Sequence, residues 1–202
     1  MRQAKADNYN LFYTGDESWF YLNSYYERQW LPSDKKPPER IKQKIDSKKD
    51  MLTIFWNPNC FLLVEALDDN RVFNADYFIG EILEQIVIKT NEDREKIKKQ
   101  LVLHYDNAGP HTAKKVREYL TQNDIQRAPQ PPYSPDLAPS DFYLFGHIKT
   151  QLQGFNFSSV DELLSQVHTI LARISETTLQ KAFTNWEHRL EQVISTKGNY
   201  YD

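Results

Sequence analysis

The chain has 202 residues, of which 40% are hydrophobic, and its formal net charge at pH 7 is -3. This length can bury one core of ordinary size, so we expect a single α/β domain over residues 1–202. The single cysteine, Cys60, excludes an internal disulfide framework and a cysteine-rich zinc site, and it fits a reducing compartment. No apolar run approaches membrane-spanning length, so we expect an intracellular, soluble protein without a membrane partner.

The first predicted strand is centred on residues 11–13 and resumes at residues 19–22. Gly15 and Asp16 lie between these two apolar stretches and are expected to interrupt the strand. We interpret the interruption as a hairpin or bulge that places the carboxylates of Asp16 and Glu17 at the break. The alternative is an ordinary polar turn.

A proline-containing basic segment follows at residues 23–49. Residues 33–49 carry seven Lys or Arg side chains against three acidic ones, although the whole chain is acidic. A loop of this length inside a compact domain is usually functional or disordered. We interpret it as a protruding arm that contacts DNA or a second subunit, and the alternative is a solvated loop.

The remaining elements alternate between strands and helices. Apolar runs predict strands over 51–56, 60–67, 101–105 and 125–128, and helical spacing predicts helices over 75–89, 111–123, 141–149, 158–174 and 177–194. Asn74 and Ser140 are the expected N-caps of the first and third helices. Residues 91–100 are expected to form an exposed helical turn or loop. This order predicts an antiparallel meander that continues through helical crossovers into parallel strands, giving a mixed sheet covered by helices.

Two carboxylates stand at the ends of predicted elements. Asp106 follows the strand at 101–105, and Asp141 follows a stiff proline-rich loop at 131–140. The helix between them moves the chain away by roughly 20 Å at ~1.5 Å per residue. The following loop, at up to ~3.3 Å per residue, can bring Asp141 back to Asp106. Asp16 can join them if its strand neighbours the strand at 101–105.

Three carboxylates in one cleft require a counter-charge. At an effective dielectric constant of about 20, two of them ~4 Å apart repel by about 4 kcal/mol. Oxygen ligands select Mg²⁺ or Mn²⁺ over zinc. Two such ions can activate an attacking oxygen and stabilise the leaving oxygen of a phosphodiester, so the residues suggest metal-dependent phosphoryl transfer.

Three motifs resemble the catalytic domain of the mariner transposases in the Tc1/mariner superfamily. They are Tyr13-Thr14-Gly15-Asp16-Glu17-Ser18-Trp19, His104-Tyr105-Asp106-Asn107-Ala108-Gly109-Pro110-His111-Thr112-Ala113, and Pro131-Pro132-Tyr133-Ser134-Pro135-Asp136-Leu137-Ala138-Pro139-Ser140-Asp141. The spacing of 34 residues between Asp106 and Asp141 and the C-terminal segment from Trp186 to Tyr201 are also similar to this family.

The resemblance implies an RNase H-like fold, with a mixed five-stranded sheet flanked by helices, and cut-and-paste DNA transposition by a homodimer. It makes Asp16, Asp106 and Asp141 both the catalytic residues and the ligands of two Mg²⁺ ions, with Mn²⁺ as a substitute. Residues 23–49 match the family's clamp loop in position. The implied DNA-binding residues are Asn107, His111, Lys35, Lys36, Arg40 and Lys42. Asn107 and His111 would support the metal ligands or face DNA, and the alternative for His111 is simply the first turn of a helix.

The chain departs from the family at two places. Gly109 stands where the family often has a basic residue, and the N-terminal helix-turn-helix part that recognises transposon ends is expected to be absent. We therefore keep two other hypotheses beside DNA cleavage and strand transfer: a transposon-derived DNA-binding or dimerisation module without activity, and an RNase H-like nuclease that acts on RNA. The expected location is the nucleus in a eukaryotic host and otherwise the cytoplasm or nucleoid.

Overall fold

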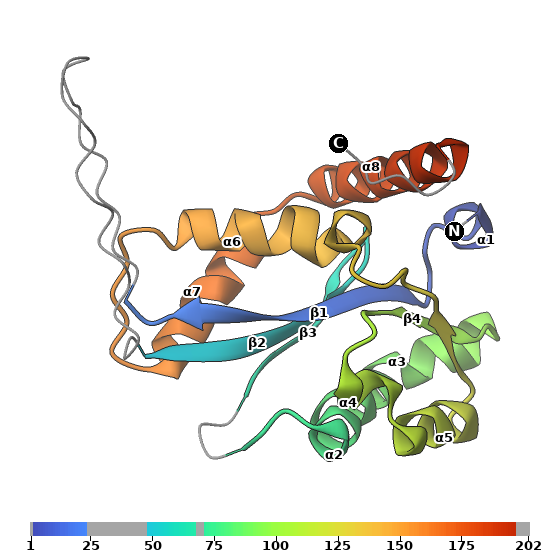
Figure 1. The fold of residues 1–202 in the computed structure, drawn as a ribbon, viewed down its shortest axis with the longest axis horizontal. Helices are drawn as coiled ribbons and strands as arrows, with labels where there is room; N and C mark the ends of the chain where they lie inside the picture. The colour runs from blue at the N-terminus through green and yellow to red at the C-terminus, as the bar shows by residue number, and fades with distance from the viewer. Residues whose placement is uncertain (1, 24–47, 68–70, 197–202) are drawn as a thin grey trace.

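A mixed five-stranded sheet forms the centre of the molecule (Figure 1). The computed structural model describes residues 2–23, 48–67 and 71–196. The strands are β1 (Phe12–Tyr21), β2 (Lys49–Trp56), β3 (Phe61–Ala66), β4 (Leu101–His104) and β5 (Ile125–Ala128), in the order β3-β2-β1-β4-β5. β1, β2 and β3 are antiparallel, whereas β4 and β5 run parallel to β1. The predicted meander with a parallel extension is confirmed.

Helices cover both faces of this sheet (Figure 1). One face is covered by a 3₁₀ turn η2 (Pro135–Leu137), a π-helical turn η3 (Ser140–Phe145) continuous with α6 (Gly146–Gln151), and the helices α7 (Val160–Ala172) and α8 (Glu176–Ser195). The opposite face is covered by α2 (Ala75–Tyr77), the π-helical turn η1 (Phe78–Leu83), α3 (Glu84–Ile97), α4 (Gly109–Thr112) and α5 (Lys114–Gln122). A short helix α1 (Arg2–Ala6) precedes β1.

The alternation of side chains along the strands divides the buried residues into two cores. Phe12 and Ile54 pack with the α6, α7 and α8 side, whereas Tyr13 and Phe55, one position further along the same strands, pack with the other side. Successive residues of a strand point to opposite faces, so both faces of β1 and β2 must be apolar where helices cover them. This pattern explains why these strands are rich in large hydrophobic residues on both faces.

β1 is one continuous strand, and the predicted break at Gly15 and Asp16 was wrong. The strand pairs with β2 without interruption from Thr14 to Tyr21, with Gly15 opposite Phe55. A Cβ atom on Gly15 would lie 2.4 Å from Cδ1 of Phe55. The glycine therefore leaves room for the aromatic ring of its cross-strand partner, which keeps the pairing intact. As a result Asp16 lies inside a strand instead of at its end.

Two further expectations about the helices need correction, and one is confirmed. Asn74 caps α2 as predicted, accepting from the backbone N–H groups of Asp76 and Tyr77. Residues 91–97 continue α3, which ends where Lys98 takes a left-handed conformation with φ of 53°. Ser140 is not an N-cap, because its Oγ accepts a hydrogen bond from Nε1 of Trp56 (3.2 Å) in the buried interior.

The predicted arm lies largely outside the described residues. Residues 24–47, which include Lys35, Lys36, Arg40 and Lys42, are not described by the structure. The two ends of the segment are adjacent, because the backbone N–H of Leu22 donates to the carbonyl of Lys48 (2.9 Å). The segment is thus inserted between two paired strands.

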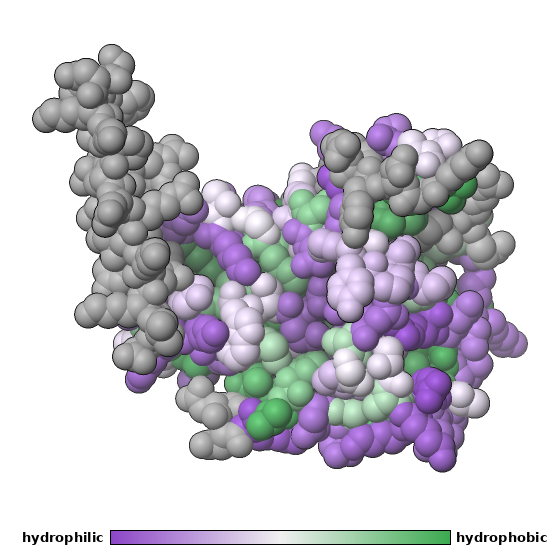
Figure 2. Space-filling model, viewed as in Figure 1, coloured by the Kyte–Doolittle hydropathy of each residue, from purple (hydrophilic) through white to green (hydrophobic). Residues whose placement is uncertain are grey.

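Hydrophilic residues line the lower and right-hand edges of the face shown in Figure 2. Within the described ranges, no helix combines the length and the apolar character needed to cross a membrane.

Candidate active site

The parallel pairing of β1 with β4 aligns two of the predicted carboxylates. Thr14 is the register partner of His104, and Asp16 and Asp106 each lie two residues further along the chain. η3 starts at Ser140 on the face covered by α6, and it carries Asp141 toward the same part of β1. The side chain of Ser140, bonded to Trp56 of β2, fixes where this turn begins.

Asp16 and Asp141 form a close carboxyl pair. The two carboxyl groups lie close enough for each to change the pKa of the other. Burial, followed by the charges of Asp141, Glu17 and Asp106, raises the pKa of Asp16 to about 8. Burial also raises the pKa of Asp141, which the ammonium of Lys149 partly offsets. Without a bound cation, the pair therefore holds a proton near neutral pH.

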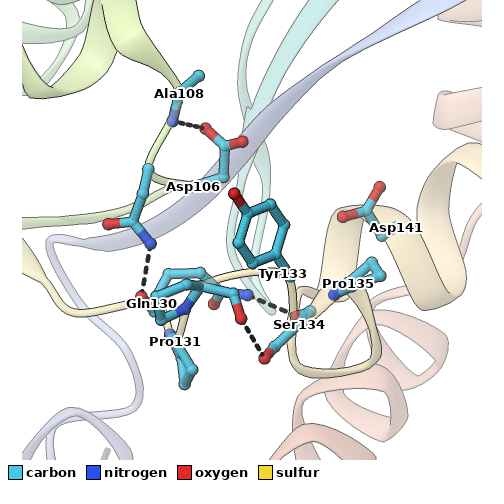
Figure 3. Close-up of a pocket in the computed structure, with 10 residues that line it drawn as sticks. Asp106, Ala108, Gln130, Pro131, Tyr133, Ser134, Pro135 and Asp141 are labelled. Carbon is cyan, nitrogen blue, oxygen red and sulfur yellow. Dashed lines mark hydrogen bonds between the residues drawn. The ribbon is translucent and has the colours of Figure 1, made fainter.

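Asp106 and Asp141 line a cleft of about 330 Å³. Besides Asp106 and Asp141, the lining residues are Asn107, Ala108, Gln130, Pro131, Pro132, Tyr133, Ser134 and Pro135. In Figure 3 the ring of Tyr133 projects between Asp106 and Asp141. The side chain of Tyr133 is 91% exposed and its φ is 53°, an unusual backbone conformation for a bulky residue. The proline-rich loop thus forms one wall of the cleft.

The carboxylate of Asp106 is held in place by contacts to one of its two oxygen atoms. Its Oδ1 accepts a hydrogen bond from the backbone N–H of Ala108 (2.9 Å) and lies 2.7 Å from Nδ1 of His111. The hydrogen bond from His111 is the main reason that the pKa of Asp106 is lowered. Burial alone would lower the pKa of His111, but Asp106 and Glu17 together raise it to about 9. Asp106 is therefore ionised at neutral pH, in contrast to the pair across the cleft.

A second buried histidine fixes the end of β4. His104 Nε2 lies 2.6 Å from Oε1 of Gln130, an atom that can only accept, so Nε2 carries the hydrogen. Its Nδ1 then accepts from the hydroxyl of Thr14 (2.9 Å), and burial lowers the pKa of His104 to about 4. The amide nitrogen of Gln130 donates to the carbonyl of Ser134 (2.6 Å). The neutral His104 thereby connects β1, β4 and the proline-rich loop.

The structure separates the two predicted DNA contacts that it describes. Asn107 is exposed, but its amide donates to the Gln130 carbonyl (2.8 Å) and its Oδ1 accepts from Arg127 (2.8 Å). His111 is 1% exposed and lies behind Asp106. Of the two roles suggested for His111, its burial favours support of Asp106 over contact with DNA.

Several residues that shape the site were not assigned a role at the site from the sequence. Glu17, Thr14 and Gln130 act through partners that are distant in the chain; Thr14 and His104, for example, are 90 positions apart. Such contacts depend on strand order, which the sequence motifs do not contain. For Glu17 a local signal existed, because it directly follows Asp16 in the first motif.

The donor set at the cleft suits a hard divalent cation. All three predicted ligands are carboxylates, and the raised pKa values of Asp16 and Asp141 mark a place where positive charge is favoured. None of the described contacts of Asp106 uses its Oδ2, so that atom can serve as a ligand. Within the described ranges, however, no three acidic, histidine or cysteine side chains are already close enough to hold one ion. In this conformation Asp16 and Asp141 lie close together, and Asp106 lies on the other side of the cleft.

Comparison with known proteins agrees with this architecture. Residues 20–100 match a family model described as a transposase with a partial DDE domain. The Mariner Mos1 transposase of Drosophila mauritiana is 23% identical over 192 residues, which span 94% of this chain and 56% of that protein. A histone-lysine N-methyltransferase of Homo sapiens, SETMAR, is 26% identical over 196 residues, which span 94% of this chain and 28% of that protein. The chain therefore spans about half or less of these curated relatives.

Solved structures show the same fold. A pre-cleavage Mos1 transpososome superposes with a TM-score of 0.85 at 23% identity, covering all of this chain and 60% of that one. The Mos1 catalytic domain alone superposes with a TM-score of 0.78 at 22% identity, covering all of this chain and 89% of that one.

The strand order and the flanking helices define an RNase H-like domain, as the sequence predicted. In sequence and fold, the chain is similar to the catalytic domain of a mariner transposase.

Proposed function

We propose that this domain cleaves phosphodiester bonds of DNA and joins the freed 3′-OH to target DNA, as the catalytic part of a cut-and-paste transposase. The observation that carries the proposal is that Asp16 lies close to Asp141 and near the ionised Asp106, beside the cleft that Asp106 and Asp141 line. A carboxyl group that burial and neighbouring carboxylates keep protonated near neutral pH is typical of a site built for a cation.

Each residue has a defined part in this proposal. Asp16, Asp106 and Asp141 would hold two Mg²⁺ ions, with Mn²⁺ as a substitute. Such ions supply the positive charge that activates an attacking oxygen and stabilises the leaving oxygen. The proline-rich loop forms the wall against which the DNA strand would lie, and Gln130 and His104 hold that wall to the sheet. Ser140 and Trp56 fix the start of the turn that carries Asp141.

DNA and a second copy of the chain are the proposed partners. The support comes from similar structures, whose names describe a Mos1 paired-end complex with the left transposon end and a paired-end complex with Mn. Under this proposal, the basic segment 24–47, with Lys35, Lys36, Arg40 and Lys42, would contact DNA or the second subunit. Its attachment between adjacent strands gives such an arm a firm base.

A nicking assay tests the activity. Supercoiled plasmid is incubated with the 202-residue chain and Mn²⁺ or Mg²⁺, and the relaxed form is measured for the wild type, Asp106→Asn and Asp76→Asn. Asp76 is an exposed residue of α2, paired with Lys115, so its substitution removes the same charge away from the cleft. We expect nicking by the wild type and Asp76→Asn, and none by Asp106→Asn.

Equal nicking by all three proteins would contradict the proposal. Absence of nicking combined with retained DNA binding would instead support a DNA-binding or dimerisation module without activity. Cleavage of an RNA strand in preference to DNA would support the RNase H-like nuclease hypothesis.

A further inference from the structure

The residue behind Asp106 has an unusual environment. His111 lies in α4, five residues after Asp106, and its side chain is fully buried. Its ring packs against the rings of Phe78 (centroids 4.4 Å apart), Tyr105 (5.0 Å) and Phe73 (5.8 Å). Three aromatic rings therefore fix the orientation of the imidazole.

Both nitrogens of this imidazole lie near carboxylates, and of these two contacts only the one at Nδ1 has hydrogen-bond geometry. Nδ1 lies 2.7 Å from Oδ1 of Asp106, and Nε2 lies 3.2 Å from Oε2 of Glu17. The Glu17 side chain is itself only 11% exposed. Glu17 follows Asp16 in β1, so it points to the opposite face of the sheet. β1 thus carries Asp16 on the face that Asp141 approaches and Glu17 on the opposite face, next to His111.

We propose that Glu17 and His111 are positioning residues that hold Oδ1 of Asp106 so that its Oδ2 faces the cleft and can bind a divalent cation. This inference rests on the proposed function, because it concerns a ligand of the proposed metal site. The chain of contacts runs from a buried carboxylate through an oriented imidazole to the ligand. Partners of this kind orient a ligand and increase its basicity.

A purely structural role for His111 makes a different prediction. Replacing His111 with an apolar side chain leaves the largely buried Glu17 without its cationic neighbour, which costs stability, so metal binding is compared only among variants that remain folded. If His111 only fills the core, an apolar replacement should leave Asp106 free to bind metal as before. If it positions Asp106, the same replacement should keep the fold and weaken metal binding.

Two substitutions with opposite charge changes separate positioning from simple electrostatics. His111→Leu removes a cationic group behind the cleft, which by charge alone would strengthen cation binding. Glu17→Gln removes an anionic group, which by charge alone would weaken it. Positioning predicts that both substitutions weaken binding. His111→Asn retains a donor near the place of Nδ1, so it should recover part of the affinity lost in His111→Leu.

The test measures Mn²⁺ affinity of the 202-residue chain by electron paramagnetic resonance, at a temperature where thermal melting shows every variant to be folded. We expect His111→Leu and Glu17→Gln to bind Mn²⁺ about 10–100-fold more weakly than the wild type, and His111→Asn to lie between. Asp76→Asn serves as the charge control at an exposed site and should bind as the wild type does. Asp106→Asn provides the loss expected when the ligand itself is changed.

Three results would overturn the inference. If the wild type binds Mn²⁺ and Asp106→Asn does not, but His111→Leu and Glu17→Gln bind as the wild type does, the positioning role is wrong and the proposed function stands. If His111→Leu binds more tightly while Glu17→Gln binds more weakly, charge alone accounts for both. Failure of the wild type to bind Mn²⁺ would overturn the inference together with the metal-dependent function.

Discussion

Asp16 and Asp141 show how a fold can maintain an electrostatically unfavourable contact. An isolated aspartate releases its proton near pH 4, yet burial and three neighbouring carboxylates raise the pKa of Asp16 to about 8. The ladder of β1 and β2 fixes Asp16 opposite Ile54, so its backbone cannot move away from Asp141 to relieve the repulsion. The pair must then take up a proton or a cation.

The pH dependence of stability follows from this shift. Because the folded-state pKa of Asp16 is raised above the unfolded value, the stabilisation from its proton is fully present below about pH 4. It is lost as pH rises to about 8. We therefore predict that the metal-free melting temperature of Asp16→Asn falls less between pH 5 and pH 8 than that of the wild type, as measured by calorimetry.

Divalent cations should change the difference in melting temperature between the wild type and Asp16→Asn. A bound ion replaces the proton, so Mn²⁺ should raise the melting temperature of the wild type most at the alkaline end of the range. Asp16→Asn should respond less to Mn²⁺. Identical pH profiles for the wild type and Asp16→Asn in the absence of metal would show that this carboxyl group does not hold the proton.

Ser140 provides a prediction about the position of Asp141. Its Oγ is the acceptor for the buried indole N–H of Trp56. Ser140→Ala leaves that donor unsatisfied, which should lower the free energy of unfolding by about 1–3 kcal/mol. Urea denaturation measures the change, and Ser165→Ala, at an exposed position of α7, is the control with an expected change near zero. A cost for Ser140→Ala no larger than the control would mean that water replaces the hydroxyl.

At the scale of elements, β1 depends on a glycine that the sequence alone presents as a strand breaker. Gly15 is tolerated in the strand because the ring of Phe55 occupies the space of the missing Cβ. Gly15→Ala should therefore destabilise the fold by about 1–3 kcal/mol, since the ring has to shift within a packed core.

A matched glycine makes that prediction specific. Gly146 lies at the start of α6 with right-handed helical backbone angles, and no atom lies within 4 Å of a Cβ built there. Gly146→Ala should stabilise the protein by about 0.5–1 kcal/mol, because alanine loses less backbone entropy in a helix. Urea denaturation of both variants compares them, and equal effects would contradict the role assigned to Phe55.

The fold could be predicted from the sequence where the signal was local. Apolar periodicity located the five strands and the long helices, and the Asn74 cap followed from a residue type at a helix start. The break in β1 was wrong because the effect of Gly15 depends on Phe55, 40 residues further along the chain. The end of α3 was placed too early because i to i+4 contacts such as Glu92–Lys96 (3.2 Å) extend the helix through a polar segment.

For the candidate site, too, the sequence predicted the features with a local signal and missed those that depend on distant contacts. Motifs and spacing pointed to Asp16, Asp106 and Asp141; in the structure Asp106 and Asp141 line one cleft, and Asp16 lies close to Asp141. Only the strand order shows that Glu17 lies on the reverse face, where it meets His111. The residues that arrange a site are harder to predict than those that line it, because their function depends on which strands become neighbours.

At the scale of the whole molecule, both cores are built on one sheet. Ile54 and Phe55 are adjacent in β2 but belong to opposite cores. Loss of either core would expose one face of the same strands, so neither helical layer should remain folded without the other. The N-terminal segment is joined to this structure as well, through the ion pair of Lys5 with Glu187 in α8 (2.5 Å).

This architecture predicts a single unfolding transition to which both cores contribute. Ile148 in α6 and Ile82 in η1 are fully buried on opposite sides of the sheet. Ile148→Val and Ile82→Val should each lower the free energy of unfolding by about 0.5–1.5 kcal/mol. Because the sheet separates the two positions, the double variant should show the sum to within ~0.5 kcal/mol. Calorimetry should give one transition in all three variants, since the five strands can lose their helices only together. Two resolved transitions, each shifted by only one of the substitutions, would instead mean that the two layers fold as separate units.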